Sequence, residues 1–197
     1  MGKCLFIADT HFYDENILKM EPERQGYSLE QMHNIMIKNW NDTVTEDDDV
    51  YVVGDFISTN DEIKIQTIVN ALKGKIHLIV GNHDHINKEY LKEHTKVDVI
   101  DYTIILDDFW IVSHEPMYVT MASPYANIFG HVHGNPMYKT VSPRSYCVSA
   151  ERIGFKPILF EKIKKEIFAC NWKKERETSL FFVMQFEWWV WISLCRH

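Results

Sequence analysis

Residues 75–84 read KIHLIVGNHD. The first half is almost wholly apolar, which is typical of a strand covered on both faces in the middle of a parallel sheet. Gly81 then interrupts the run, and Asn82, His83 and Asp84 follow together where the chain leaves the sheet. In α/β proteins, ligands bind at this carboxyl edge of the strands. The stretch therefore predicts a buried strand that delivers three polar side chains to a binding site.

The same arrangement, an apolar strand followed at once by polar side chains, recurs four more times. The groups that follow the five strands are Asp9 with His11, Asp55, Asn82 to Asp84, His114, and His131 with His133. Residues two apart in an extended chain point to the same face, so D-x-H and H-x-H each present both side chains together. Converging groups of this kind would leave many polar atoms unpaired, and divalent cations remove that cost. Imidazole, carboxylate and amide ligands without a thiolate favour Mn, Fe, Zn or Ni over Ca or Mg.

The hydrophobic pattern predicts the elements that carry these groups. We expect strands at 3–9, 50–55, 75–80, 127–134 and 145–151, helices at 28–41 and 61–73, and a hairpin at 103–116. Ser28 and Gln31 match a capping box, and Asp61 lies where the second helix begins. Early alternation of strands and helices, followed by hairpins, indicates mixed sheets flanked by helices.

Length and composition limit the class of protein. A chain of 197 residues, 46% hydrophobic and 25% charged, is typical of one soluble globular domain. The net charge of −7 argues against an extended nucleic-acid surface, which needs clustered Lys and Arg. The four cysteines have no zinc-finger or disulfide spacing, and the sequence opens in a strand rather than a signal peptide. We therefore expect a cytoplasmic protein with free thiols.

The polar blocks together resemble the calcineurin-like metallophosphoesterases. Their five-block pattern, D-x-H, G-D, G-N-H-D/E, H and G-H-x-H, is matched in full between about residues 4 and 160, and WNDTVTEDDDVYVVGDF (40–56) is similar to a subgroup of small bacterial and phage phosphoesterases. The resemblance implies an α/β fold, a four-layer α-β-β-α sandwich of two mixed sheets. It places the metallophosphoesterase domain at residues 1–168.

The resemblance also implies a site with two divalent metal ions, Mn first among them and Fe, Zn or Ni as alternatives. The first ion would be held by Asp9, His11, Asp55 and His133, and the second by Asp55, Asn82, His114 and His131. His83 corresponds to the family's catalytic histidine and Asp84 to the carboxylate that orients it. The implied reaction is hydrolysis of a phosphomonoester or phosphodiester by a metal-bridging hydroxide, with His83 protonating the leaving oxygen.

Other functions stay open from the sequence. The expected partner is a small or flexible phosphate ester, but a nuclease, a cyclic-nucleotide phosphodiesterase or a non-catalytic metal-binding scaffold would carry the same blocks. Arg24, in the loop after the first block, is either a contact for substrate phosphate or a solvated cation. Asp14 stands where the subgroup often has a histidine, which leaves substrate recognition undefined.

Residues 169–197 form an aromatic-rich tail to which the resemblance does not extend. The apolar run 180–194 is shorter than the roughly 20 residues that a spanning helix needs. Three interpretations compete: an element that packs on the domain or across a homo-oligomer, a segment that contacts a membrane surface, and a poorly ordered or non-native extension.

Overall fold

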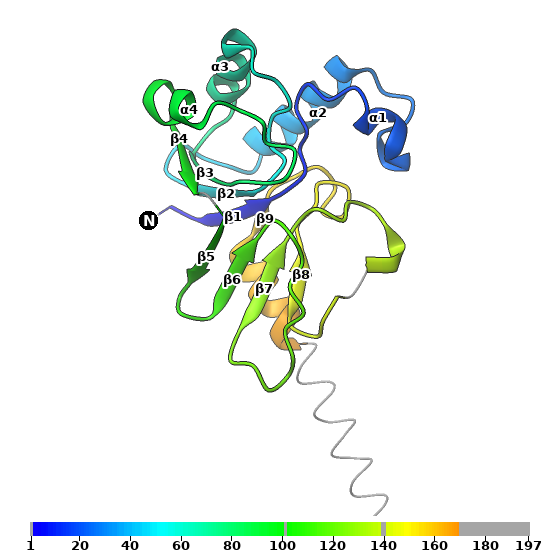
Figure 1. Ribbon diagram of the computed structural model, residues 1–197, viewed down its shortest axis with the longest axis vertical. Helices are drawn as coiled ribbons and strands as arrows, with labels where there is room; N and C mark the ends of the chain where they lie inside the picture. Colours follow the sequence, from blue (N-terminus) through cyan, green and yellow to red (C-terminus); the bar gives the residue numbers. More distant parts are fainter. Residues whose placement is uncertain (1, 101, 139–140, 170–197) are drawn as a thin grey trace, which may run out of the picture.

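The computed structural model describes residues 2–100, 102–138 and 141–169, and within them the chain forms two mixed sheets with helices (Figure 1). The first sheet has the strand order β4-β3-β2-β1-β9 and the second β5-β6-β7-β8. The strands are β1 (Cys4–Ile7), β2 (Asp49–Val53), β3 (Lys75–Ile79), β4 (Val97–Ile100), β5 (Thr103–Leu106), β6 (Trp110–Ser113), β7 (Ala126–Phe129), β8 (Ser145–Cys147) and β9 (Ile158–Leu159). The helices are α1 (Ile17–Met20), η1 (Pro22–Arg24), α2 (Leu29–Asn41), α3 (Glu62–Ala71), α4 (Lys88–His94) and η2 (Pro136–Tyr138), and residues 160–169 are also helical.

Helices cover one face of the first sheet. Strands β1 to β4 run parallel, and β9 adds an antiparallel edge. The mainly apolar sequences of β1, β2 and β3 are typical of parallel strands in the middle of a sheet. The residues of this sheet that face the helices share one buried cluster with Met36 and Trp40 of α2 and with Ile65 and Ile68 of α3. This layer fixes where the carboxyl ends of the parallel strands lie.

A second buried cluster joins the two sheets. Phe6, on the opposite face of the first sheet, belongs to the same cluster as Trp110 and Ile128 of the second. The Phe160 ring, from helix 160–169, lies 5.2 Å from the Phe6 ring and 5.3 Å from the Trp110 ring, so this helix contacts both sheets. Because β1 also continues into a bridge with Ser149 beyond β8, the strand ends of both sheets meet at one edge (Figure 1).

The elements predicted from the pattern are present, with strands that end early. The two mixed sheets, α2 with its capping box at Ser28, α3 capped by Asp61, and the β5–β6 hairpin are confirmed. Strands predicted to reach residues 9, 55 and 134 end at Ile7, Val53 and Phe129 instead. The pattern did not predict α1, α4, β4, β9 or helix 160–169, which are short or follow no clear period.

Two further predictions concern the C-terminal tail and membrane contact. Apart from residue 169, the predicted tail at 169–197 lies outside the described residues. In the part of the chain that is described, no helix has the length and apolar character needed to cross a membrane.

Candidate metal centre

The predicted metal ligands stand on strained backbone at the ends of the strands. Five of the seven have a positive φ: Asp9 (58°), His11 (48°), Asp55 (54°), His131 (70°) and His133 (47°). A left-handed conformation costs a non-glycine residue roughly 1 to 2 kcal/mol and persists only where surrounding structure enforces it. The strain also explains why the strands end early, because a left-handed residue cannot continue the sheet ladder. Such clusters of strained residues are typical of functional sites.

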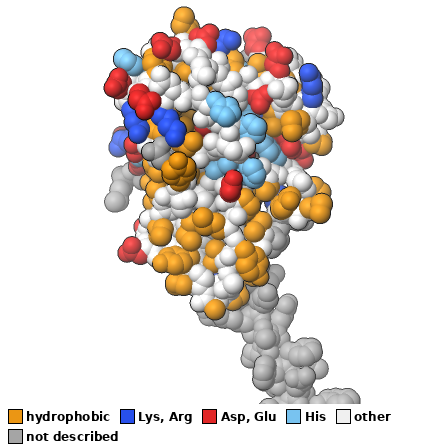
Figure 2. Space-filling view, viewed as in Figure 1, with side chains coloured by type: hydrophobic (Ala, Val, Ile, Leu, Met, Phe, Trp, Pro, Cys, Tyr) orange, Lys and Arg blue, Asp and Glu red, His pale blue; other side chains and the backbone are white. Residues whose placement is uncertain are grey.

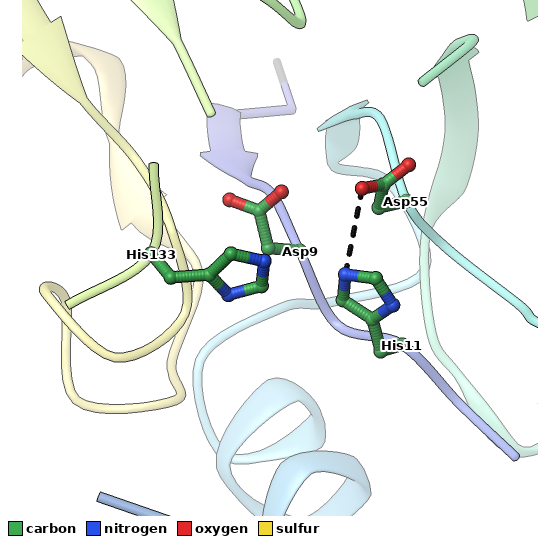
Figure 3. A group of neighbouring side chains, drawn as sticks. All are labelled: Asp9, His11, Asp55 and His133. Atoms are coloured by element: carbon green, nitrogen blue, oxygen red, sulfur yellow. Dashed lines mark ion pairs between the residues drawn. The ribbon is translucent and has the colours of Figure 1, made fainter. Parts of the chain in front are cut away.

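The first predicted metal position is a buried group of four side chains. The ligand atoms of Asp9, His11, Asp55 and His133 all lie within 4.8 Å of one another (Figure 3). Asp9, His11 and Asp55 are at most 3% exposed. Both ring nitrogens of His11 are buried and have no hydrogen-bond partner. Unpaired buried polar atoms are costly, and a divalent cation with nitrogen and oxygen ligands would satisfy them. The residues therefore fit such an ion.

The second predicted position shares Asp55 with the first. His114 Nε2 lies 3.3 Å from Asp55 Oδ2 and 2.8 Å from Asn82 Oδ1. His131 Nδ1 lies 3.0 Å from the same Asn82 oxygen. The other ring nitrogen of His114, Nδ1, lies 2.9 Å from the Val53 carbonyl oxygen, and donation to that oxygen leaves Nε2 to face the site. All seven residues predicted as ligands are thus brought together.

His83 lies beside this centre without filling a ligand place. Its backbone N–H donates to Asp55 Oδ1 at 2.8 Å, and its exposed ring is centred 5.5 Å from the His11 ring. The imidazole is therefore free to meet a substrate.

Asp84 makes its described hydrogen bonds with backbone groups. Its buried carboxylate accepts hydrogen bonds from the backbone N–H groups of Asp55, Phe56 and Gly81, at 2.8 to 2.9 Å. Among the described hydrogen bonds, none joins it to His83, so the prediction that Asp84 orients the His83 ring is not supported. Instead, Asp84 ties the loop after β3 to the loop that carries Asp55.

Arg24 is neither a solvated cation nor placed to meet substrate. Its side chain is 1% exposed, and it donates to Glu151 and to the carbonyl oxygens of Asp9 and Thr10. This placement argues against the predicted contact between Arg24 and substrate phosphate, because the guanidinium faces the protein interior.

Two acidic residues of the site were missed. Glu151 Oε1 lies 3.3 Å from His133 Nδ1, and Asp14 Oδ2 lies 3.4 Å from His11 Nδ1. Each stands behind a predicted ligand, on the ring nitrogen that ligation through Nε2 leaves free. Glu151 is the last residue of the predicted strand 145–151, directly after SYCVSA, so the rule that found the other groups could have found it.

Three glycines of the sequence blocks leave room for the ligands. A Cβ at Gly54 would lie 2.1 Å from His114 Nδ1, one at Gly81 would lie 2.4 Å from Asp55 Oδ1, and one at Gly130 would lie 3.0 Å from Asp9 Oδ2. Any side chain at these positions would displace a ligand. The space beside these predicted ligands therefore requires glycine at all three positions, and Gly54 has in addition a positive φ of 86°.

Comparisons with known proteins place the chain among relatives. It is 34% identical over 172 residues to the uncharacterized protein MJ1445 of Methanocaldococcus jannaschii, covering 85% of this chain and 92% of that protein. The chain belongs to the same family as MJ1445. Its fold is similar to the crystal structure of the protein of unknown function AQ665 from Aquifex aeolicus, with a TM-score of 0.65 and 27% identity over 84% of this chain and 99% of that one. No protein-family model matches the chain.

Asp55 and His114 form a coupled ionic pair in the metal-free protein. Burial lowers the pKa of His114, but the hydrogen bond and charge of Asp55 outweigh it and raise that pKa to about 9. Burial raises the pKa of Asp55, but the nearby imidazoles of His11 and His114 outweigh burial and hold that pKa well below its usual range. At neutral pH the pair is therefore charged on both sides.

This pair predicts proton release on metal binding. A metal ion must displace the proton of His114, so its affinity should rise with pH up to about 9. In the metal-free protein the sign is opposite: stability from the raised His114 pKa is complete below its ordinary pKa of 6.5 and is lost as pH rises through about 9. Calorimetric titration with Mn²⁺ at pH 7, in two buffers of different ionisation enthalpy, measures the protons released. Equal heats in both buffers would contradict the expectation.

A matched pair of glycine variants tests the space requirement. Gly54 (φ 86°) and Gly26 (φ 87°) share one backbone conformation, but a Cβ at Gly26 would meet nothing within 4 Å. Gly26→Ala should cost about 1 kcal/mol of stability and leave metal content unchanged. Gly54→Ala should in addition displace His114 and lower metal content, measured by elemental analysis after gel filtration. Equal metal content in the two variants would contradict the role given to Gly54.

Proposed function

We propose that the protein is a dinuclear-metal phosphoesterase of the calcineurin-like kind, which hydrolyses phosphomonoesters or phosphodiesters. One observation supports this most strongly. His11 Nε2 and His114 Nε2, one from each predicted metal position, approach the same oxygen of Asp55, Oδ2, at 3.4 and 3.3 Å. A carboxylate between two such ligand sets is the arrangement that two neighbouring cations need. The two mixed sheets are consistent with the implied four-layer sandwich.

The chain's own residues would divide the work. The two bound cations would supply a nucleophile from water at neutral pH and neutralise phosphate charge. Asp55 would set the spacing between the two positions, and Asp84 would hold Asp55 by its backbone. His83, exposed and not needed as a ligand, would give a proton to the leaving oxygen.

The surroundings of the centre favour a small ester over a nucleic acid. Histidines gather in one patch on the face seen in Figure 2, with apolar side chains below them. Cavities of about 360, 550 and 410 Å³ border this centre, one beside His114, one beside His131 and His133, and one beside His83. Among the described residues that line them there is no Lys or Arg, while Glu21, Glu115 and Asp14 are present. A nuclease needs cations along a polyanion, so this lining argues against one.

Hydrolysis of two model esters tests the proposal. Metal-stripped protein should hydrolyse bis-p-nitrophenyl phosphate or p-nitrophenyl phosphate only after addition of Mn²⁺, Ni²⁺ or Zn²⁺, and Mg²⁺ should be weaker. His83→Ala should bind the same metal and lose about 100-fold in kcat on an alkyl ester, with a smaller loss on nitrophenyl esters, whose leaving group needs no proton. A fully occupied protein without turnover on any ester would contradict the proposal and favour a scaffold.

The shared carboxylate gives a second, independent test. Asp55→Asn removes a negative charge from both positions, so it should reduce metal content at each, measured by elemental analysis and Mn²⁺ titration. Asp48→Asn is the matched control, because Asp48 is also buried and accepts backbone hydrogen bonds, from Lys3 and Thr45, away from the centre. Two fully occupied ions in Asp55→Asn would contradict the bridging role.

A further inference from the structure

We propose that Arg24 and Glu151 are a buried pair of positioning residues that builds the first metal position, and that this position therefore fills first and holds its ion more tightly than the second. The first position is Asp9, His11, Asp55 and His133, and the second is Asp55, Asn82, His114 and His131. The inference rests on the proposed dinuclear site and assigns its two halves different properties.

Arg24 stabilises the strained turn that carries two ligands of the first position. Its two terminal nitrogens donate to the backbone carbonyl oxygens of Asp9 and Thr10, the latter at 3.0 Å. Asp9 and His11, on either side of Thr10, are both left-handed, with φ of 58° and 48°. An arginine fork can serve several acceptors in fixed directions, which a lysine ammonium cannot. Arg24 is therefore suited to hold this turn in place before a metal arrives.

Glu151 connects Arg24 to a third ligand of the first position. One oxygen, Oε1, accepts from Arg24 Nε at 2.7 Å and lies 3.3 Å from His133 Nδ1. Donation from His133 Nδ1 to this oxygen fixes the tautomer that leaves Nε2 for a metal. The Glu151 side chain is fully buried in this contact. One ion pair thus positions Asp9, His11 and His133, although His133 is more than 100 residues from the other two in the sequence.

The pair is better explained as support for the site than as another cation site. The side chains of Glu21, His133 and Glu151 also lie close enough together to hold a metal ion. However, the guanidinium of Arg24 stands 2.7 Å from Glu151 Oε1, and a second positive charge there would be repelled. The buried arginine therefore favours a positioning role for Glu151.

The second position lacks comparable support among the described contacts. Of the ligands that belong to the second position alone, Asn82 and His131 are exposed and His114 is buried. Of those that belong to the first position alone, Asp9 and His11 are buried and His133 is half-buried. The described hydrogen bonds of the Asn82 oxygen come from the other ligands, His114 and His131. Behind His114, Nδ1 contacts the Val53 carbonyl oxygen and lies 3.9 Å from Asp9 Oδ1, but no described contact joins these ligands to an arginine–carboxylate pair. Exposed side chains lose conformational entropy when they bind a metal ion, and this loss lowers the affinity of the second position. The two positions are therefore unequal.

Titration of metal-stripped protein with Mn²⁺ tests this asymmetry directly. Binding is followed by the loss of the free-ion electron paramagnetic resonance signal, and occupancy of both positions by the spectrum of a spin-coupled pair. Wild-type protein should bind one ion tightly before the coupled spectrum appears. Asn82→Ala should keep the tight ion and lose the coupled pair. Glu151→Gln, close in shape, should weaken the first binding step at least tenfold, and Arg24→Lys should do so as well.

The controls separate positioning from general stability. Asp48→Asn removes another buried carboxylate and should leave both binding constants unchanged, and circular dichroism of each variant reports whether it is folded. Should Glu151→Gln fail to fold, Arg24→Lys carries the same test. Unchanged first-step affinity in a folded variant overturns the positioning role but leaves the dinuclear site intact. A wild-type protein that binds no metal overturns both proposals, and two equal sites overturn the asymmetry alone.

Discussion

The loops at the edge where the two sheets meet are held in place by contacts with one buried carboxylate, that of Asp55. One oxygen accepts from the backbone of His83, and the other faces His11 and His114. Its own backbone N–H is held by Asp84. A charge that is 2% exposed needs such partners, since its isolated burial would be prohibitive. The loops that follow β1, β2, β3 and β6 are therefore fixed relative to one another by contacts that all lead to this residue.

The backbone around Asp55 is strained, and hydrogen bonds from residues behind the site stabilise it. Five ligands adopt left-handed conformations within a few residues of strand ends. Arg24 supports the turn after β1, Asp84 supports the turn after β2, and glycines such as Gly81 keep the neighbouring chain close without a clash.

The sequence predicts the candidate ligands better than it predicts the residues that hold them in place. That the predicted ligands lie together could be inferred because each follows an apolar strand, and parallel strands bring their carboxyl ends to one edge. The supports could not, because Arg24 and Glu151 are 127 residues apart and their pairing depends on how the second sheet returns beside β1. The contacts of Asp84 could not be predicted for the same reason: adjacency to His83 suggested a side-chain partner, whereas the carboxylate accepts hydrogen bonds from backbone groups 28 and 29 residues away. The local sequence pattern shows which side chains follow a strand, whereas their supporting contacts become visible only in the tertiary structure.

The acidic character of the protein bears on the chemistry that we propose. The chain has a net charge of −7, and the described lining of the cavities beside the centre contributes carboxylates rather than Lys or Arg. Arg24, the one buried arginine among the described residues near the predicted ligands, is already paired with Glu151. A phosphate would meet the carboxylates that line these cavities, and their negative charge would oppose its binding. Cations at the two positions would reverse that potential, so metal would be required for the substrate to bind as well as for its hydrolysis.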